Sequence, residues 1–171
     1  LDLGRRIERT HFSIRLLRGL CVRNDPNAPV VMSLQLELAD SAMTYRSRYQ
    51  TSPELTAVLD LVLSDRSNPR SLIFQLDMLE EHMNLMPLEQ PMGRPSMAQQ
   101  VLLSARTDVA LAEVEKLAGV KSRNGRLTHL DRLLRRTSNN VSQLAELIAS
   151  TYFSHAVGHR ITGYAQPESK T

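Results

Sequence analysis

The chain has 171 residues, enough to bury one sizeable hydrophobic core. Its 42% hydrophobic and 23% charged residues exclude an intrinsically disordered protein, and its longest apolar runs are far too short to cross a bilayer. The net charge of +3 is modest and demands no polyanionic partner, although 18 of the 21 basic residues are arginine, which pairs with carboxylates and phosphates through a planar fork.

Two helical patterns open the chain. The first predicted helix runs from about Asp2 to Val22, with apolar residues spaced for one buried face. Two prolines within residues 26–29 end it. The second predicted helix runs from about Val30 to Tyr49, again with apolar residues at three- and four-residue steps.

Two polar-then-proline pairs mark the next helix starts. Ser52-Pro53 predicts a capped third helix over about 53–64, which is apolar nearly all round and should therefore sit centrally. Asn68-Pro69 repeats the signal and predicts a fourth helix that ends near Leu85.

The Pro- and Gly-rich segment 86–95 separates these from two further helices. The fifth is predicted over about 96–118, with a stripe of mostly small residues from Met97 to Ala112 suited to close packing. The sixth is predicted over about 126–161, with a heptad spacing and a break or bend at 138–140.

No segment alternates apolar and polar residues as a half-buried strand does. We therefore predict an all-α fold, an antiparallel helical bundle of about six helices. Residues 1–165 should form a single helical domain, followed by a frayed tail at 166–171.

Signals for metal, nucleotide or nucleophilic chemistry are weak. The chain has no glycine-rich phosphate loop and no nucleophile elbow, so no cofactor is predicted. His155 and His159 share a helix face but lack a third ligand, so no metal is predicted either.

Cys21 has apolar neighbours, which favours a buried, inert thiol over a reactive one. A single cysteine also fits a reducing compartment, and we expect a cytoplasmic protein.

The first helix carries the best catalytic candidate. Glu8 lies three residues from Arg5, next to Arg9, and three residues from His11. Three roles for Glu8 are open: surface pairing along its own helix, an ion pair with another helix, or orientation of a ligand whose carboxylate or phosphate is held by Arg5 or Arg9.

Further arginines near helix ends are candidates for anion binding. Tyr45 and Tyr49 share a face of the second helix, with Arg46 and Arg48 beside them. A structural role, in which the rings seal the core and the cations complement the helix dipole, is favoured over an anion site. Arg70 in a first helical turn opposes the dipole, and we expect it to pair with Asp65 or Glu8 or to hold a ligand.

Several segments, in the same order, carry a resemblance to a known family: LDLGRRIERT, MTYRSRY, SDRSNPRSLIFQLDMLEEHM and STYFSHA. The sequence resembles the bacterial alpha-E family of helical domains over nearly all of its length. Arg6 stands where that family often has an aromatic residue. The resemblance places family motif positions on residues Gly4, Arg5, Glu8, Arg9, Tyr45, Arg46, Arg48, Tyr49, Asn68, Pro69, Arg70 and Ser71.

The resemblance also implies a context. Alpha-E domains are about twice as long as this chain, so the chain is expected to be the C-terminal half of a larger domain. They occur with circularly permuted ATP-grasp domains and transglutaminase-like peptidases, in a setting of peptide synthesis or modification. The implied partners are an ATP-grasp amide-ligase-like domain or protein and a peptide substrate.

Three functions follow as hypotheses. The leading one is an accessory domain that binds the ligase, its peptide or both. The alternative is an enzyme in the same system, with Glu8 as a general base beside anion-binding arginines; whether the chain is an enzyme stays open. An arginine-mediated RNA-binding protein has little support, because Trp is absent and aromatic content is 4%.

A missing first half would leave apolar faces uncovered, so we expect self-association or an exposed apolar patch.

Overall fold

The computed structural model describes residues 2–22, 29–86, 94–119 and 122–161, with the backbone alone for 152–161. Within these ranges the chain is helical and contains no strand. The predicted tail at 166–171 and the side chains of His155 and His159 lie outside the described residues. No helix in the described ranges is long and apolar enough to cross a membrane.

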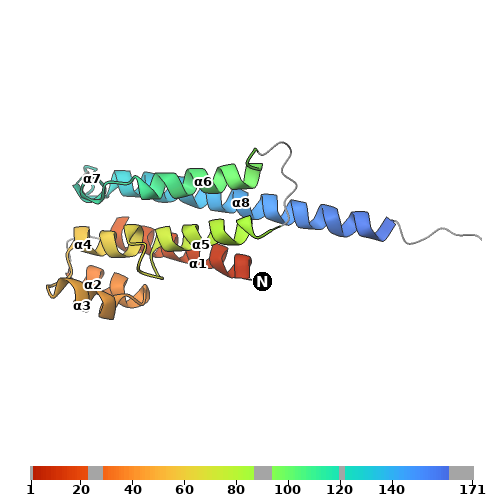
Figure 1. Cartoon of the computed structure of the whole chain (residues 1–171). Coiled ribbons are helices and arrows are strands. Elements are labelled where there is room, and N and C mark those ends of the chain that lie inside the picture. Colours follow the sequence, from red (N-terminus) through yellow and green to blue (C-terminus); the bar gives the residue numbers. More distant parts are fainter. Residues whose placement is uncertain (1, 23–28, 87–93, 120–121, 162–171) are drawn as a thin grey trace, which may run out of the picture.

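Four long helices form the centre of the fold. They pack in a ring, in which each helix contacts the next along the chain and the last contacts the first. Figure 1 shows that neighbours in this ring run in opposite directions. The predicted all-α antiparallel bundle is therefore confirmed. The four helices are α1 (Asp2–Leu17), α5 (Leu72–Asn84), α6 (Met97–Ala110) and α8 (Thr128–Ile161).

Shorter elements cover one side and one end of this bundle. In Figure 1, α2 and α3 lie beyond α1 and α4, while α7 lies at the end of α6. Two π-helical turns, in which the helix widens locally, extend α1 and α4. The short elements are the π-helix η1 (Arg18–Val22), α2 (Pro29–Leu38), α3 (Ala42–Tyr49), α4 (Leu55–Leu59), the π-helix η2 (Asp60–Ser64) and α7 (Val114–Gly119).

Two of the predicted helices are in fact divided, so the described residues hold eight α-helices rather than about six. The predicted helix at 30–49 is interrupted at 39–41, where Asp40 takes a left-handed conformation with φ of 49°. The predicted helix at 96–118 ends at Ala110, and α7 restarts at Val114, which packs into the core with Leu117. Neither break contains glycine or proline, so the sequence pattern gives no sign that a helix ends at either of them.

Three other predictions about helix limits are wrong. Ser52 does not cap, because α4 begins at Leu55 and Glu54 occupies the N-cap position. Asn68 does not cap either: α5 begins at Leu72, and Ser71 caps it by accepting a hydrogen bond from the Phe74 amide at 3.1 Å. The last helix passes through residues 138–140 as one continuous α8.

The third predicted helix does sit centrally. Val58, Leu59, Leu61 and Leu63 are fully buried, in a contiguous core that every helix of the ring enters. Met97, by contrast, is exposed at the start of the predicted small-residue stripe. The packed stripe of α6 therefore begins at Ala98, which is buried in the core.

Candidate functional site

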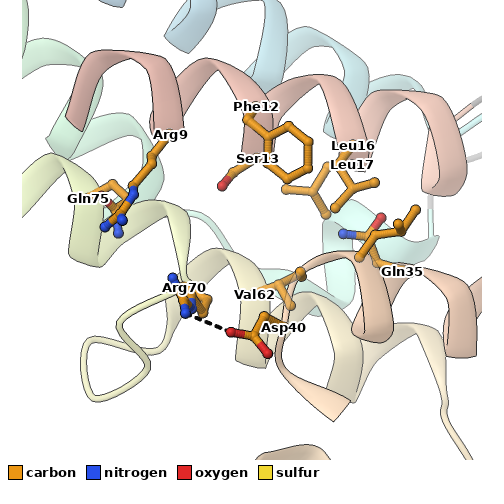
Figure 2. A pocket seen from close by; sticks show the side chains of 12 residues that line it. Arg9, Phe12, Ser13, Leu16, Leu17, Gln35, Asp40, Val62, Arg70 and Gln75 are labelled. Atoms are coloured by element: carbon orange, nitrogen blue, oxygen red, sulfur yellow. Dashed lines mark hydrogen bonds and ion pairs between the residues drawn. The ribbon is translucent and has the colours of Figure 1, made fainter. Parts of the chain in front are cut away.

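A half-open cavity of about 210 Å³ lies between α1, α2 and the segment that joins η2 to α5. Its walls are mostly apolar, and Figure 2 shows charged groups from three different segments near one end. The cavity is lined by Arg9, Phe12, Ser13, Leu16, Leu17, Gln35, Leu38, Ala39, Asp40, Val62, Arg70 and Gln75.

Two of the predicted anion-binding residues, Arg9 and Arg70, meet at this cavity. Arg9 projects from α1 and is exposed, and its guanidinium has no hydrogen bond or ion pair with any described residue. Arg70 donates from Nη2 to Oδ2 of Asp40 at 2.6 Å (Figure 2). The structure thus leaves one free guanidinium and one paired guanidinium at the mouth of the cavity.

Asp40 is a partner that sequence reasoning missed. Arg70 was expected to pair with Asp65 or Glu8, but it lies before α5 rather than in its first turn, so it reaches the α2–α3 turn instead. The left-handed backbone of Asp40 is tolerated because a short acidic side chain has little steric conflict there. This turn carries the carboxylate to the edge of the cavity.

Gln35 lines the cavity from α2 and is only 1% exposed. Its Oε1 accepts a hydrogen bond from the Cys21 thiol, with a sulfur–oxygen distance of 3.8 Å. Its Nε2 points into the cavity in Figure 2 and has no partner among the described residues. A buried amide donor that faces a cavity calls for an acceptor there.

Cys21 supports Gln35 and is itself inaccessible. Burial raises the pKa of the Cys21 thiol to about 12, so the thiol stays protonated and donates to Gln35. The predicted burial of Cys21 is confirmed.

Gln75 forms a fixed wall of the same cavity. Its Nε2 donates to the carbonyl oxygen of Pro69 at 2.6 Å, and its Oε1 accepts from Nη1 of Arg6 at 3.3 Å. Both ends of this buried amide are therefore engaged. The bond to Pro69 also holds the segment that carries Arg70.

Glu8 and Arg5 lie elsewhere on α1. Both side chains are exposed, neither lines the cavity, and neither makes a hydrogen bond or ion pair within the described ranges, although the charge of Arg5 helps to lower the pKa of Asp2. The surface pairing of Glu8 with Arg5 or His11 is not formed. A catalytic arrangement would need Glu8, an arginine and a tyrosine around one pocket, and around this cavity those groups do not converge.

Tyr45 and Tyr49 have structural partners. The buried Tyr45 hydroxyl donates to the carbonyl oxygen of Ser52 and accepts from the amide of Glu54, both at 3.2 Å. The two rings lie 4.7 Å apart, and Tyr49 donates to Asp60 at 2.8 Å. The pair holds the start of α4 against α3, in line with the favoured structural role.

Arg46 and Arg48 are also engaged locally. Arg46 lies 3.5 Å from Glu37 in an exposed ion pair. Arg48 pairs with Asp65 and donates to Ser67 at 3.0 Å. Burial alone would raise the pKa of Asp65, but hydrogen bonds from Ser67 and Arg48 outweigh it and hold that pKa below its usual value.

Sequence reasoning selected Arg9 and Arg70 but missed the rest of the cavity. Phe12 is exposed on α1 at a position between the apolar steps, and Gln35 is a polar residue inside an apolar pattern. A buried polar residue in such a pattern is the one signal that could have found Gln35. Among the described side chains, no cluster of three metal-ligating residues is present.

Comparison with known proteins places the chain in a family. Residues 1–153 match the Alpha-E family, described as a predicted alpha-helical domain with a conserved ER motif. The one Glu-Arg dipeptide of this sequence is Glu8-Arg9, of which Arg9 lines the cavity and Glu8 does not. No solved structure matches the chain.

Three curated relatives are uncharacterised proteins, two from strains of Mycobacterium tuberculosis and one from Mycobacterium bovis. Each is 28% identical over 153 residues, which cover 88% of this chain. The chain spans only 17% of the length of these relatives. Because the family model covers most of the sequence, the chain belongs to the Alpha-E family.

Proposed function

We propose that this chain is a peptide-binding accessory domain that serves an ATP-grasp amide ligase, and that it catalyses no step itself. One observation carries the proposal: an apolar cavity holds two donors, the Arg9 guanidinium and the Gln35 amide, that have no described partner. Apolar walls with a few convergent polar groups are typical of ligand sites.

The size of the cavity favours a small part of a peptide over a nucleotide. Sites for drug-sized ligands enclose roughly 300–1,000 Å³. The volume here is about 210 Å³, which is better suited to a single amino-acid residue. ATP would accordingly be bound by the ligase.

The family resemblance supports the partner. Alpha-E domains are associated with ATP-grasp proteins, and such ligases act on carboxylates. An arginine is well suited to present a carboxylate, because its planar fork matches the two oxygens. A cytoplasmic location, where ATP is available, is part of the proposal.

The alternative of an enzyme has less support. Glu8 is exposed to solvent and lies outside the cavity, so the cavity would not bring a substrate to its carboxylate. RNA binding has less support too, because Arg135 and Arg136 of α8 are paired with Asp131 and Asp108.

The test is reconstitution with an ATP-grasp protein from the same genome. The two proteins should co-purify, and ATP hydrolysis should rise when peptide is added. Arg9→Gln should lower the peptide-dependent rate, while Arg5→Gln, a matched change of an exposed arginine on the same helix that lies outside the cavity, should not.

Glu8→Gln separates the binding domain from the enzyme. If the chain only binds, turnover should be unchanged in this variant, with folding and association intact. Loss of turnover under those conditions would instead assign Glu8 a direct role. Absence of co-purification with any ATP-grasp protein would overturn the proposed partnership.

A further inference from the structure

We propose that the cavity binds the carboxyl-terminal residue of a peptide whose last side chain is apolar. The terminal carboxylate would pair with Arg9, the side chain would pack on Phe12 and Leu16, and a backbone carbonyl farther along the peptide would accept from Gln35 at the other end of the cavity (Figure 2). This inference rests on the proposed function and names the part of the peptide that is recognised.

The charges at the mouth of the cavity favour a ligand group that carries a single negative charge. Arg9 and Arg70 contribute two positive charges, and the Asp40 carboxylate, 2.6 Å from Arg70, offsets one of them. A carboxylate balances the remaining charge of Arg9. A phosphate dianion would meet the additional repulsion of Asp40, so the site discriminates against phosphorylated ligands.

The apolar wall selects the side chain. Phe12 is 48% exposed and forms the outer part of the wall, while Leu17 and Val62 are fully buried behind it. An aromatic ring left this exposed beside a cavity gains by covering its face. A polar or charged terminal side chain would lose its hydration against the same surface.

Gln35 adds a directional contact at the inner wall. Because its Oε1 is occupied by the Cys21 thiol, only the Nε2 donors are available to a ligand. A backbone carbonyl that precedes the terminal residue farther along the peptide supplies the acceptor that this buried amide lacks. Free amino acids have no such carbonyl and should bind less tightly than peptides.

The rest of the peptide has a path over α2. Leu38 lines the cavity, and Leu34 lies one helical turn before it, so both occur on the same face. They are 48% and 44% exposed. Residues that precede the terminal one would cover this exposed strip as the chain leaves the cavity.

The direct test uses one short peptide in two forms, ending in leucine with either a free carboxylate or a carboxamide. Each carries a fluorophore at its amino end, and binding is followed by fluorescence anisotropy. The free carboxylate should bind at least about tenfold more tightly, because the amide removes the charge that pairs with Arg9.

Variants assign the contacts. Arg9→Gln should reduce the affinity for the carboxylate form to that of the amide form, while Arg5→Gln should leave both unchanged. Gln35→Leu should weaken the binding of both peptides alike. It should leave the binding of the free amino acid leucine unaffected. Circular dichroism and urea unfolding of each variant establish that the fold is retained.

The outcomes separate this inference from the proposed function. If both peptide forms bind equally and Arg9→Gln has no effect, the carboxylate assignment is overturned while peptide binding stands. If neither form binds, either to the chain alone or to its complex with the ligase, both the carboxylate assignment and the proposed function are overturned. The inference would also be overturned if a second copy of the chain occupied the cavity. Sedimentation would then show a dimer that peptide does not dissociate.

Discussion

Asn68 connects three segments of the chain through its buried side-chain amide. Its Nδ2 donates to the carbonyl oxygen of Leu61 at 2.9 Å and to the hydroxyl of Ser41 at 3.2 Å. Its Oδ1 accepts from the amide of Arg70 at 3.1 Å. The residue thus joins η2 to the α2–α3 turn and fixes the backbone of an arginine at the cavity.

Asn68→Ala should therefore destabilise the fold by about 2 kcal/mol, because it leaves buried polar groups without partners. Urea unfolding at neutral pH measures the change. Asn139→Ala, at an exposed position of α8, is the control and should alter the free energy of unfolding by less than about 0.5 kcal/mol. Equal effects of the two changes would contradict the assignment.

Asp131 gives a pH-dependent contribution at the junction of η1 and α8. It accepts hydrogen bonds from Arg18 and Arg135, each at 2.9 Å. Burial alone would raise the pKa of Asp131, but these two arginines outweigh it and lower that pKa from 3.8. The ionised carboxylate therefore stabilises the folded state above the unfolded pKa, and this stabilisation is lost as pH falls through the lower, folded pKa.

Asp131→Asn should lower the free energy of unfolding at neutral pH by about 1 kcal/mol, because one neutral amide replaces two charge-assisted contacts. The gap between the parent and the variant should shrink as the pH falls below 3.8, where the parent also becomes protonated. Urea unfolding across this range tests the sign. A gap that is the same at every pH would show that the contribution is not ionic.

Helix starts distinguish two serines that look alike in the sequence. Ser71 is buried and caps α5 through the Phe74 amide, whereas the exposed Ser52 makes no side-chain cap. Ser71→Ala should cost about 1 kcal/mol of stability and Ser52→Ala less than about 0.5 kcal/mol. Thermal or urea unfolding of both variants measures the difference, and a larger effect at Ser52 would refute it.

Much of the helical content could be predicted from periodicity, because buried faces recur at three- and four-residue steps. The limits of the helices could not. Asp40 and Leu111 end helices without glycine or proline, so nothing in the local pattern separates them from the interior of a longer helix. These breaks arise from tertiary packing, which places Tyr45 and Val114 in the core.

The cavity was predictable only in part for the same reason. Arg9 stood out beside Glu8 on the first helix, and Arg70 as a cation in a predicted first helical turn. Asp40 was assigned to a helix interior, and Gln35 became visible only when its burial was known. A site assembled from segments about thirty residues apart depends on how the helices pack, which single-sequence patterns do not specify.

At the scale of the whole molecule, the small outer helices and the four-helix ring share one core. Met32, Leu36 and Tyr45 of α2 and α3 belong to the same buried cluster as Leu79 and Leu130 of the ring. The cavity lies where these two parts meet. A peptide bound there would therefore contact both, and its binding should stabilise the fold as a whole.

This continuity predicts that the chain unfolds in one cooperative step. Trp is absent, so tyrosine dominates the fluorescence. In a Tyr152→Phe, Tyr164→Phe variant the remaining rings, Tyr45 and Tyr49, both lie in α3 and report on the outer helices. Their urea midpoint should coincide with that of the far-ultraviolet circular dichroism, which follows all helices. A fluorescence transition at lower urea would mean that α2 and α3 unfold separately, and that the cavity opens before the ring does.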